Sequence, residues 1–340
     1  MVTSPTGGSD PAHAGRPDAH GTESGDPAYL DGLSNLPAPA RLTVGIVSAG
    51  RVGTALGAAL EQAGHVVGAV VARSAESRAR ATLRLPESEI LELDAVVARS
   101  ELLIISVPDA RLDSVVADIA ATGSLRPNTL VAHTAGARGI SALEPLITLG
   151  ALPLALHPAM TFVGTGDDTA RLRHCCFGVT AADEVGFAIA QALVLEMGGE
   201  PVRIAEEHRT LYHAALAHGA NHLIALVSDA VAALNAAIAP AGDDGRDATV
   251  DGNSVLLAER ILGPLVTASL QNVLELGPSA LTGPVARGDA DAVAAHLAAL
   301  RDIPDGPGRD GIAEAYRTLA RRAAARTDAP DDLLDTLAAP

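Results

Sequence analysis

Short apolar runs alternate with helical patterns along the chain from Arg41 onwards. Five of these runs are apolar at both odd and even positions, which is typical of strands that are buried on both faces of a sheet. Helical segments between successive strands favour a parallel sheet with helices on both sides. The five predicted strands span residues 42–47, 66–72, 102–107, 129–132 and 151–156.

Two further short strands are predicted at 176–180 and 201–204, on either side of a helix at 183–197. Beyond Ala205 no strand pattern recurs, and the chain has only helical patterns. These helices are predicted at 207–239, 252–276, 289–301 and 310–326, with a loop at 240–251 between the first two. The pattern therefore predicts an α/β fold, in which a doubly wound, Rossmann-like parallel sheet is followed by an all-helical C-terminal domain.

Changes in composition set the predicted domain limits. Residues 1–40 are rich in Gly, Pro, Ser, Asp and His in no periodic order, which predicts a disordered tail. We expect the sheet domain at 41–205, the helical domain at 206–328 and a short tail at 329–340.

The charged residues exclude several functions. The chain has 340 residues and a net charge of −17, and all 24 of its basic residues are arginines. Without lysine there is no Schiff base and no P-loop phosphate lysine. The acidity and the scattered arginines argue against a nucleic-acid partner.

Other compositional features concern location and assembly. The N-terminus has no basic segment followed by an apolar one, and no long apolar run is free of polar residues, so we expect a cytoplasmic protein with no membrane partner. Cys175 and Cys176 are adjacent, which suits neither an ordinary disulfide nor a zinc site, and we interpret them as a buried strand pair. The helices rich in Ala and Leu exceed what one sheet can cover, which favours a homodimer.

The segment 43–56 joins the first strand to a helix and carries a glycine pattern. It matches the dinucleotide fingerprint G-x-G-x-x-G, with Ser48 in place of the first glycine. Gly50 lets the backbone approach a pyrophosphate, and Gly53 permits close packing of the helix on the strand. A tight turn with nothing bound is the alternative, but the flanking strand and helix favour the nucleotide. The expected cofactor contacts in this loop are Ser48, Ala49, Gly50, Arg51, Val52 and Gly53.

The second strand ends in Arg73 and Ser74, where an NAD-binding protein would carry an acid for the ribose 2′-hydroxyl. A guanidinium and a hydroxyl suit a 2′-phosphate instead, which predicts NADP, with Arg78 as a helper one turn later. An exposed loop arginine is the alternative interpretation of Arg73. The predicted strand at 102–107 runs into Pro108. Val107 and Pro108 are both expected at the cofactor site because ligands of doubly wound sheets bind at this edge.

The next two strands end at the same edge in His133-Thr134-Ala135-Gly136 and in His157-Pro158. His157 is well placed to face a nicotinamide ring, and a structural histidine bonded to the backbone is the alternative. Thr134 is a candidate substrate contact.

Taken together, the segments 47–53, 106–109, 133–136, 157–158, 211–215 with Asn221, and 281–289 resemble a family of NADP-dependent oxidoreductases. Members of this family have a Rossmann-like N-terminal domain and a C-terminal helical domain of unassigned function, and they are related to the ketopantoate, pyrroline-carboxylate and 6-phosphogluconate reductases. The resemblance spans about residues 41–300 and implies that the helical domain binds substrate and forms the dimer.

The resemblance also points to catalytic residues on the first long helix. Ketopantoate reductases carry a lysine eight residues before an asparagine, and these positions fall on His213 and Asn221. Residues 213, 217 and 221 form one row of the helix, so both side chains can reach one cleft. A histidine can supply the proton that an alkoxide needs after hydride transfer, and Asn221 can hold the oxygen. Tyr212 points about 100° away from His213 along the helix, so we do not expect both to serve one atom.

The resemblance implies an NADPH-dependent reductase of a small 2-oxo acid, with ketopantoate as the first substrate to try, bound in the cleft between the domains. An imine reductase of the pyrroline-carboxylate type is a second enzyme hypothesis, and a non-catalytic NADP-binding sensor is the hypothesis from another class. Arg287 is a candidate for the substrate carboxylate, unless it forms a surface pair with Asp289. His218 and His222 have the spacing of a helical metal pair but lack a third ligand, so no metal is expected.

Overall fold

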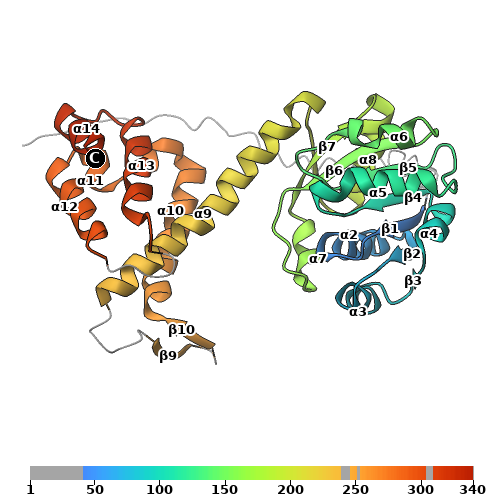
Figure 1. Cartoon of the computed structure of the whole chain (residues 1–340), viewed down its shortest axis with the longest axis horizontal. Helices are drawn as coiled ribbons and strands as arrows, with labels where there is room; N and C mark the ends of the chain where they lie inside the picture. Colours follow the sequence, from blue (N-terminus) through green and yellow to red (C-terminus); the bar gives the residue numbers. More distant parts are fainter. Residues whose placement is uncertain (1–40, 239–245, 251–252, 304–308, 340) are drawn as a thin grey trace, which may run out of the picture. The chain divides into compact units, whose positions relative to one another are not determined.

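A computed structural model of the chain describes residues 41–238, 246–250, 253–303 and 309–339. The predicted tail at 1–40, with its two histidines, lies outside these ranges, as does most of the predicted loop at 240–251. The sheet and the helices that follow it are shown in Figure 1.

Eight strands form a mixed sheet in the order β3-β2-β1-β4-β5-β6-β7-β8. The chain order reverses between β1 and β4, which is the switch point where doubly wound sheets bind their ligands. The predicted strands are all present, and the sequence pattern missed only the two-residue β3 of this sheet. The strands are β1 (Thr43–Val47), β2 (Val66–Val71), β3 (Glu89–Ile90), β4 (Leu102–Ile105), β5 (Leu130–His133), β6 (Leu152–Pro158), β7 (Cys176–Ala181) and β8 (Glu200–Arg203).

The prediction of a parallel sheet is confirmed for the first six strands, and the last two strands run in the opposite direction. β7 runs antiparallel to β6, and this register places Gly178 opposite His157. The reason is the connection between them, in which α7 (Asp167–Leu172) packs against α2 instead of crossing the sheet. A connection that stays at one edge returns the chain in the opposite direction.

Helices cover both faces of the sheet, as the sequence predicts (Figure 1). α2 (Arg51–Gln62) and α8 (Glu184–Glu196) pack on one face, and α3 (Ala75–Arg84) lies against α2. Three helices cover the other face. Aliphatic side chains of these helices and of the strands are buried between them. The three helices are α4 (Leu93–Arg99), α5 (Asp109–Ala121) and α6 (Glu144–Ile147), the last entered through the 3-10 turn η1 (Ile140–Leu143).

The chain beyond the sheet is mainly helical. The 3-10 turn η2 (Glu206–His208) leads into α9 (Arg209–Ile238), which is the longest helix of the described chain. The later elements are α10 (Leu257–Leu276), η3 (Gly277–Ala280), α11 (Gly283–Arg287), α12 (Ala290–Arg301), α13 (Ile312–Ala324) and α14 (Asp331–Ala338).

Two predictions for this part are wrong. The expected tail at 329–340 contains α14, whose Leu333 and Leu337 are buried against α12 and α13, so its apolar spacing is that of a packed helix. Strands also occur after residue 205, because β9 (Arg246–Val250) and β10 (Asn253–Leu256) form an antiparallel pair. Both segments are short and have no regular alternation of apolar and polar residues, so hydrophobic periodicity did not reveal them.

The two cysteines also differ from expectation. Cys175 is buried, whereas Cys176 is exposed at the first position of β7. Successive residues of a strand point to opposite sides, so two neighbours at its end need not share one environment.

Aliphatic side chains lie exposed along α9 and α10. Ile224 on α9 is 62% exposed, and Leu265 and Leu274 on α10 are 62% and 77% exposed. By length and composition alone, the segment Glu206–Ile238 could cross a membrane, and none of its most apolar window is buried. This segment is the single candidate span within the described ranges.

Candidate functional site

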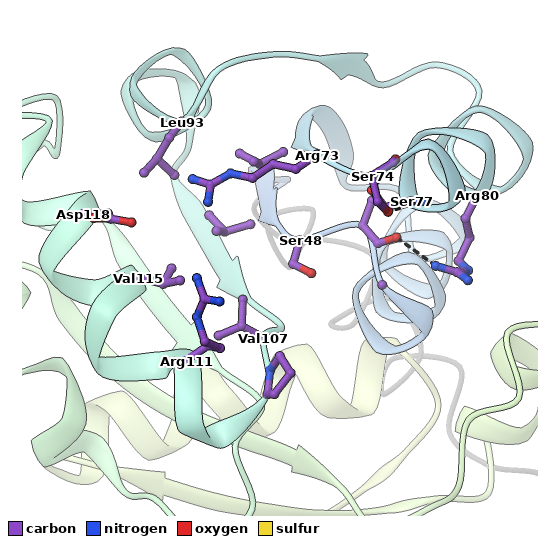
Figure 2. A pocket seen from close by; sticks show the side chains of 15 residues that line it. Ser48, Arg73, Ser74, Ser77, Arg80, Leu93, Val107, Arg111, Val115 and Asp118 are labelled. Atoms are coloured by element: carbon purple, nitrogen blue, oxygen red, sulfur yellow. Dashed lines mark hydrogen bonds between the residues drawn. The ribbon is translucent and has the colours of Figure 1, made fainter.

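A pocket of about 430 Å³ opens at the carboxyl ends of β1, β2 and β4 (Figure 2). This is the edge and the switch point at which the sequence predicts a dinucleotide. We refer to it as the cofactor pocket. Its lining residues are Val47, Ser48, Ala49, Gly50, Val71, Arg73, Ser74, Ser77, Arg80, Leu93, Val107, Pro108, Arg111, Val115 and Asp118.

The loop between β1 and α2 has the geometry of the fingerprint despite its serine. Ser48 has a φ of 83°, in the left-handed region that glycine usually occupies. Its carbonyl oxygen accepts a hydrogen bond from the Ser106 hydroxyl at 2.8 Å. A Cβ at Gly53 would lie 2.4 Å from that same carbonyl oxygen, so only glycine lets α2 pack this close to β1.

The second strand leads into the cationic part of the pocket. Ser74 is the N-cap of α3, and its hydroxyl oxygen accepts a hydrogen bond from the Ser77 amide at 3.0 Å. Arg73 and Arg111 reach into the same hollow from different elements (Figure 2). Among the described residues, neither guanidinium has a hydrogen-bond or ion-pair partner, whereas Arg80 pairs with Glu76.

The pocket contains most of the predicted cofactor residues and some that the sequence did not reveal. Arg51, Val52 and Gly53 do not line it, and the Arg51 guanidinium instead donates to the Phe162 carbonyl at 3.4 Å. The predicted helper Arg78 is exposed and lies outside the lining. Ser77 and Arg80, which are i, i+3 neighbours on α3, line the pocket in its place. Arg111 was missed, although its position just after Pro108 at the sheet edge could have indicated it.

A second polar group of residues lies at the carboxyl ends of β5 and β6, against the first turns of α9. We call it the histidine edge and define it as His133, His157, Arg209, Tyr212 and His213. Arg209 is 1% exposed, and its guanidinium donates to three backbone carbonyls. The acceptors are Arg138 at 2.8 Å, Gly178 at 3.1 Å and Ala135 at 3.3 Å.

Glu206 makes a further connection between η2 and the loop after β5. Its carboxylate accepts hydrogen bonds from the amides of Ile140 at 2.8 Å and Ser141 at 3.1 Å, at the start of η1. Burial acts to raise the pKa of Glu206, but these hydrogen bonds and Arg209 outweigh it, so the pKa is lowered. The start of α9 is therefore fixed to the loop at 134–141.

His133 is a structural residue. Its Nδ1 accepts a hydrogen bond from the Ala135 amide at 3.2 Å, and its Nε2 lies 2.9 Å from the Gly139 carbonyl, to which it donates. Burial lowers the pKa of His133 to about 4, with Arg209 acting in the same direction. Both ring nitrogens are thus occupied, and the ring shapes the loop without facing a ligand.

His157 contacts two side chains of α9. Its Nδ1 lies 3.0 Å from the Tyr212 hydroxyl, and its ring centroid lies 5.7 Å from that of His213. Tyr212 and His213 thus meet different parts of one imidazole, because the ring of His157 is wide enough to contact neighbouring positions of the helix. Burial lowers the pKa of His157 to about 4, with the charges of Arg209 and His213 adding to the effect.

Two glycines provide the space for these rings. A Cβ at Gly136 would lie 2.7 Å from His213 Cδ2 and 2.9 Å from His157 Nε2. A Cβ at Gly178 would lie 2.6 Å from the Tyr212 hydroxyl. The space beside Gly136 is thus bounded by two imidazoles.

The remaining predicted site residues are not brought together with the histidine edge. Asn221 is exposed two turns further along α9, about 12 Å from His213 at the rise of a helix. Thr134 lines a small apolar void of about 10 Å³ between the sheet and α2. Arg287 is exposed on α11, and Asp289 caps α12 instead of pairing with it.

His218 and His222 do contact each other on α9, with their Nδ1 atoms 2.7 Å apart. In the part of the chain that the structure describes, no group of three or more His, Cys, Asp or Glu side chains could hold a metal ion.

Comparisons with known proteins match both parts of the chain. Residues 31–158 match a family model described as a Rossmann-like domain. Residues 175–323 match a model described as a domain of unknown function, DUF2520. The chain joins a Rossmann-like domain to a DUF2520 domain. The DUF2520 match begins within the sheet, so it includes β7 and β8 as well as the helices.

Solved structures share the fold of the combined Rossmann-like and DUF2520 chain. A "putative NADP oxidoreductase" from Bacteroides fragilis is 22% identical, with a TM-score of 0.64 over 84% of this chain and 98% of its own. A reductive aminase from Aspergillus terreus is 18% identical, with a TM-score of 0.54 over 87% and 99%. A pyrroline-5-carboxylate reductase from Coxiella burnetii is 13% identical, with a TM-score of 0.51 over 85% and 99%. No curated protein sequence matches the chain.

Proposed function

We propose that this chain is an NADPH-dependent reductase of a C=N or C=O bond in a small molecule. The observation that carries the proposal is the pair of unpartnered guanidiniums, Arg73 and Arg111, in a pocket at the same sheet edge as His157 and His213. Both guanidiniums are solvent-exposed and line this pocket, and the planar fork of a guanidinium suits the phosphates of a dinucleotide. The proteins with similar folds include an NADP oxidoreductase, a pyrroline-5-carboxylate reductase and a reductive aminase, which supports the same class.

The cofactor pocket fits NADP in shape and in charge. Gly50 leaves the backbone open at the start of α2, where free amides and the positive end of the helix dipole favour a pyrophosphate. Arg73, Ser74 and Ser77 offer a guanidinium and two hydroxyls where a 2′-phosphate would lie. The pocket lining contains one carboxylate, Asp118, and it belongs to α5 instead of the end of β2, where NAD would need it.

The histidine edge supplies the other half of the chemistry. NADPH, when bound, supplies a hydride to the unsaturated carbon of the substrate. The electron pair of the double bond then moves to the oxygen or nitrogen, which needs a proton unless it was protonated beforehand. His213 is the proton donor of the proposal, since it is partly exposed and lies against Gly136 and His157.

Imines come first in the proposed substrate range. Two of the proteins with similar folds act on C=N bonds according to their names, whereas ketopantoate has no such support. In addition, the guanidinium of the histidine edge is already occupied, because Arg209 donates to three backbone carbonyls. A free carboxylate on the substrate therefore has no obvious partner there, and neutral cyclic imines and ketones with amines are better probes than 2-oxo acids alone.

The test is a substrate panel with NADPH consumption as the measurement. It includes cyclic imines, ketones mixed with small amines, and 2-oxo acids, each with NADPH and with NADH. We expect turnover with at least one imine, and His213→Ala should lower kcat by about a hundredfold while the affinity for NADPH stays within twofold. His174→Ala is the control, since that residue is exposed and remote from both sites. If the full panel gives no turnover, the chain is the non-catalytic sensor, and if NADPH also fails to bind, the cofactor assignment is wrong.

We also infer that a second copy of the chain covers the exposed aliphatic side chains of α9 and α10. A membrane is the less favourable occupant, because His218, Asn221 and His222 interrupt the apolar surface of α9 and polar groups are costly in a bilayer. Homodimers are the commonest way in which soluble proteins bury such faces. The requirement is local to these helices, since Leu297 of α12 and Leu333 and Leu337 of α14 are buried in a core with alanines of α13.

Light scattering during size-exclusion chromatography tests this inference. The wild-type chain should elute with twice the mass of one chain, and Leu265→Glu with Leu274→Glu should produce a monomer. Val185→Glu is the matched control, because Val185 is 69% exposed on α8 of the sheet region. A monomeric wild-type protein, or one recovered only with lipid vesicles, would overturn the dimer.

A further inference from the structure

Tyr212 has no role in the reduction described so far, although its hydroxyl is the partner of His157. The ring of Tyr212 lies above Gly178, whose missing side chain leaves room for the hydroxyl. Arg209 lies nearby, with its guanidinium carbon 5.7 Å from the centre of the Tyr212 ring. The same arginine donates to the Gly178 carbonyl, so one glycine of β7 supports both residues.

The direction of the hydrogen bond between Tyr212 and His157 follows from the charge state of both partners. Burial raises the pKa of Tyr212, so the phenol keeps its proton at neutral pH. Burial and Arg209 lower the pKa of His157 to about 4, so the imidazole is neutral and has one acceptor nitrogen. Of two neutral partners, the phenol is the stronger acid and the imidazole nitrogen is the stronger base, so the Tyr212 hydroxyl donates to Nδ1 of His157.

We propose that Tyr212 is a positioning residue, which holds His157 in the tautomer with its proton on Nε2 and so directs that N–H to the side of the ring that faces Gly136 and His213. The observation behind the proposal is that Nδ1 contacts Tyr212, while Nε2 lies on the side of Gly136 and His213. A donor at this place can bind the oxygen or nitrogen on which charge develops. This role rests on the proposed reduction, but the tautomer of His157 does not.

The contrast with His133 supports this assignment. His133 is also neutral and also has its proton on Nε2, but that nitrogen donates to the Gly139 carbonyl. In His157 the equivalent nitrogen has no backbone acceptor among the contacts of the described chain, and it faces Gly136 and His213 instead. The two histidines thus use the same tautomer, one for the loop and one for a ligand.

Nitrogen-15 NMR of the full-length protein tests the proposal directly. His157→Gln identifies the resonances of His157. In the wild type at neutral pH, Nδ1 should have the shift of an unprotonated nitrogen and Nε2 that of a protonated one. In Tyr212→Phe both should move to intermediate values, because the tautomer is no longer fixed. Tyr316→Phe is the matched control, since it removes a similar bond from Tyr316 to His296 at 2.9 Å in the helical region.

A second variant changes the geometry without removing the phenol. Gly178→Ala should push the Tyr212 hydroxyl away from His157 and produce the same change in the nitrogen shifts. With a substrate found by the panel, Tyr212→Phe should lower kcat by about tenfold and leave the KM for NADPH unchanged. A wild-type His157 protonated on Nδ1, or shifts unchanged in Tyr212→Phe, would overturn the proposal. The nitrogen shifts test the tautomer of His157 even if no substrate turns over. Failure of the reductase assignment is therefore distinguished from failure of the tautomer assignment.

Discussion

The two polar sites at the carboxyl edge of the sheet treat their arginines in opposite ways. In the cofactor pocket, Arg73 and Arg111 project into open space without a protein partner among the described residues. At the histidine edge, Arg209 is buried, and its guanidinium donates hydrogen bonds to three backbone carbonyls. The same residue type therefore serves a ligand at one site and the fold at the other.

This difference separates binding from stability. A cation that has no protein partner contributes little to folding and is available to a ligand, whereas one that satisfies buried carbonyls is part of the structure. Variants in the cofactor pocket should therefore change ligand affinity, and variants at the histidine edge should change the free energy of unfolding.

The largest effect is expected from Arg209→Ala. Removing this guanidinium leaves three backbone carbonyls without their donor, and each unsatisfied buried group costs about 1 kcal/mol or more. We therefore expect the free energy of unfolding to fall by about 3 kcal/mol, measured by urea denaturation. Arg73→Ala is the matched control, and its urea midpoint should equal that of the wild type. Equal midpoints for all three proteins would show that Arg209 is not a structural residue.

Acid should destabilise the histidine edge by at most a similar amount for each buried histidine. His133 and His157 have a folded pKa of about 4, below the ordinary value of 6.5, so the unfolded chain binds more protons between these limits. Their stabilisation is complete above about pH 6.5 and is lost as the pH falls towards 4, by at most about 3 kcal/mol for each histidine. His133→Gln should flatten the dependence of the urea midpoint on pH in this window, and His174→Gln should leave it unchanged. A wild-type midpoint that does not vary between pH 6.5 and 4 would contradict the burial of both rings.

Arg73→Ala should change cofactor choice without changing stability. Loss of the guanidinium that faces the 2′-phosphate should weaken NADPH binding by about 10- to 100-fold, which corresponds to about 1.4–2.8 kcal/mol. NADH binding should change by less than twofold. Calorimetry with adenosine 2′,5′-bisphosphate and with ADP would separate the phosphate contribution, because only the first carries the 2′-phosphate. An equal loss for both ligands would place Arg73 at the adenine or the pyrophosphate instead.

The smallest effect is expected for Arg111→Ala. This residue comes from α5 and not from the end of β2, so we expect it to stack on the adenine, which both cofactors share. Its loss should weaken NADPH and NADH binding by a similar factor of about threefold. The ratio of the two dissociation constants, compared with that of Arg73→Ala, is the measurement. A selective loss of NADPH would show that Arg111 faces the 2′-phosphate as well.

Hydrophobic patterning predicted the sheet almost completely, because its strands are apolar on both faces and are separated by helices. It failed where the information was not local. The direction of β7 depends on α7 packing against α2, and β9 and β10 are too short and irregular to show a hydrophobic period. α14 was assigned to a tail, although Leu333 and Leu337 have the spacing of a buried helical stripe.

The site was predictable to a similar degree. The fingerprint loop and the end of β2 indicated the cofactor pocket, since both depend on residues that are close in sequence. The histidine edge was only partly visible, because Tyr212 and His157 are far apart in the chain and meet through the register of β7. Arg209 was not identified at all, since nothing in its sequence neighbourhood indicates burial. Asn221 was assigned by resemblance, and the described chain does not bring it to His213.

The attachment of α9 has a practical consequence for dividing the protein into fragments. The DUF2520 match starts at residue 175, but a fragment that starts there would take β7 and β8 away from β6 and leave two unpaired sheet edges. A cut near residue 205 spares the sheet but removes Glu206 and Arg209, which hold the loop at 134–141. The first turn of α9 therefore belongs to the sheet and the rest to the helices. An expression boundary placed after His213 keeps every connection of the histidine edge in one piece.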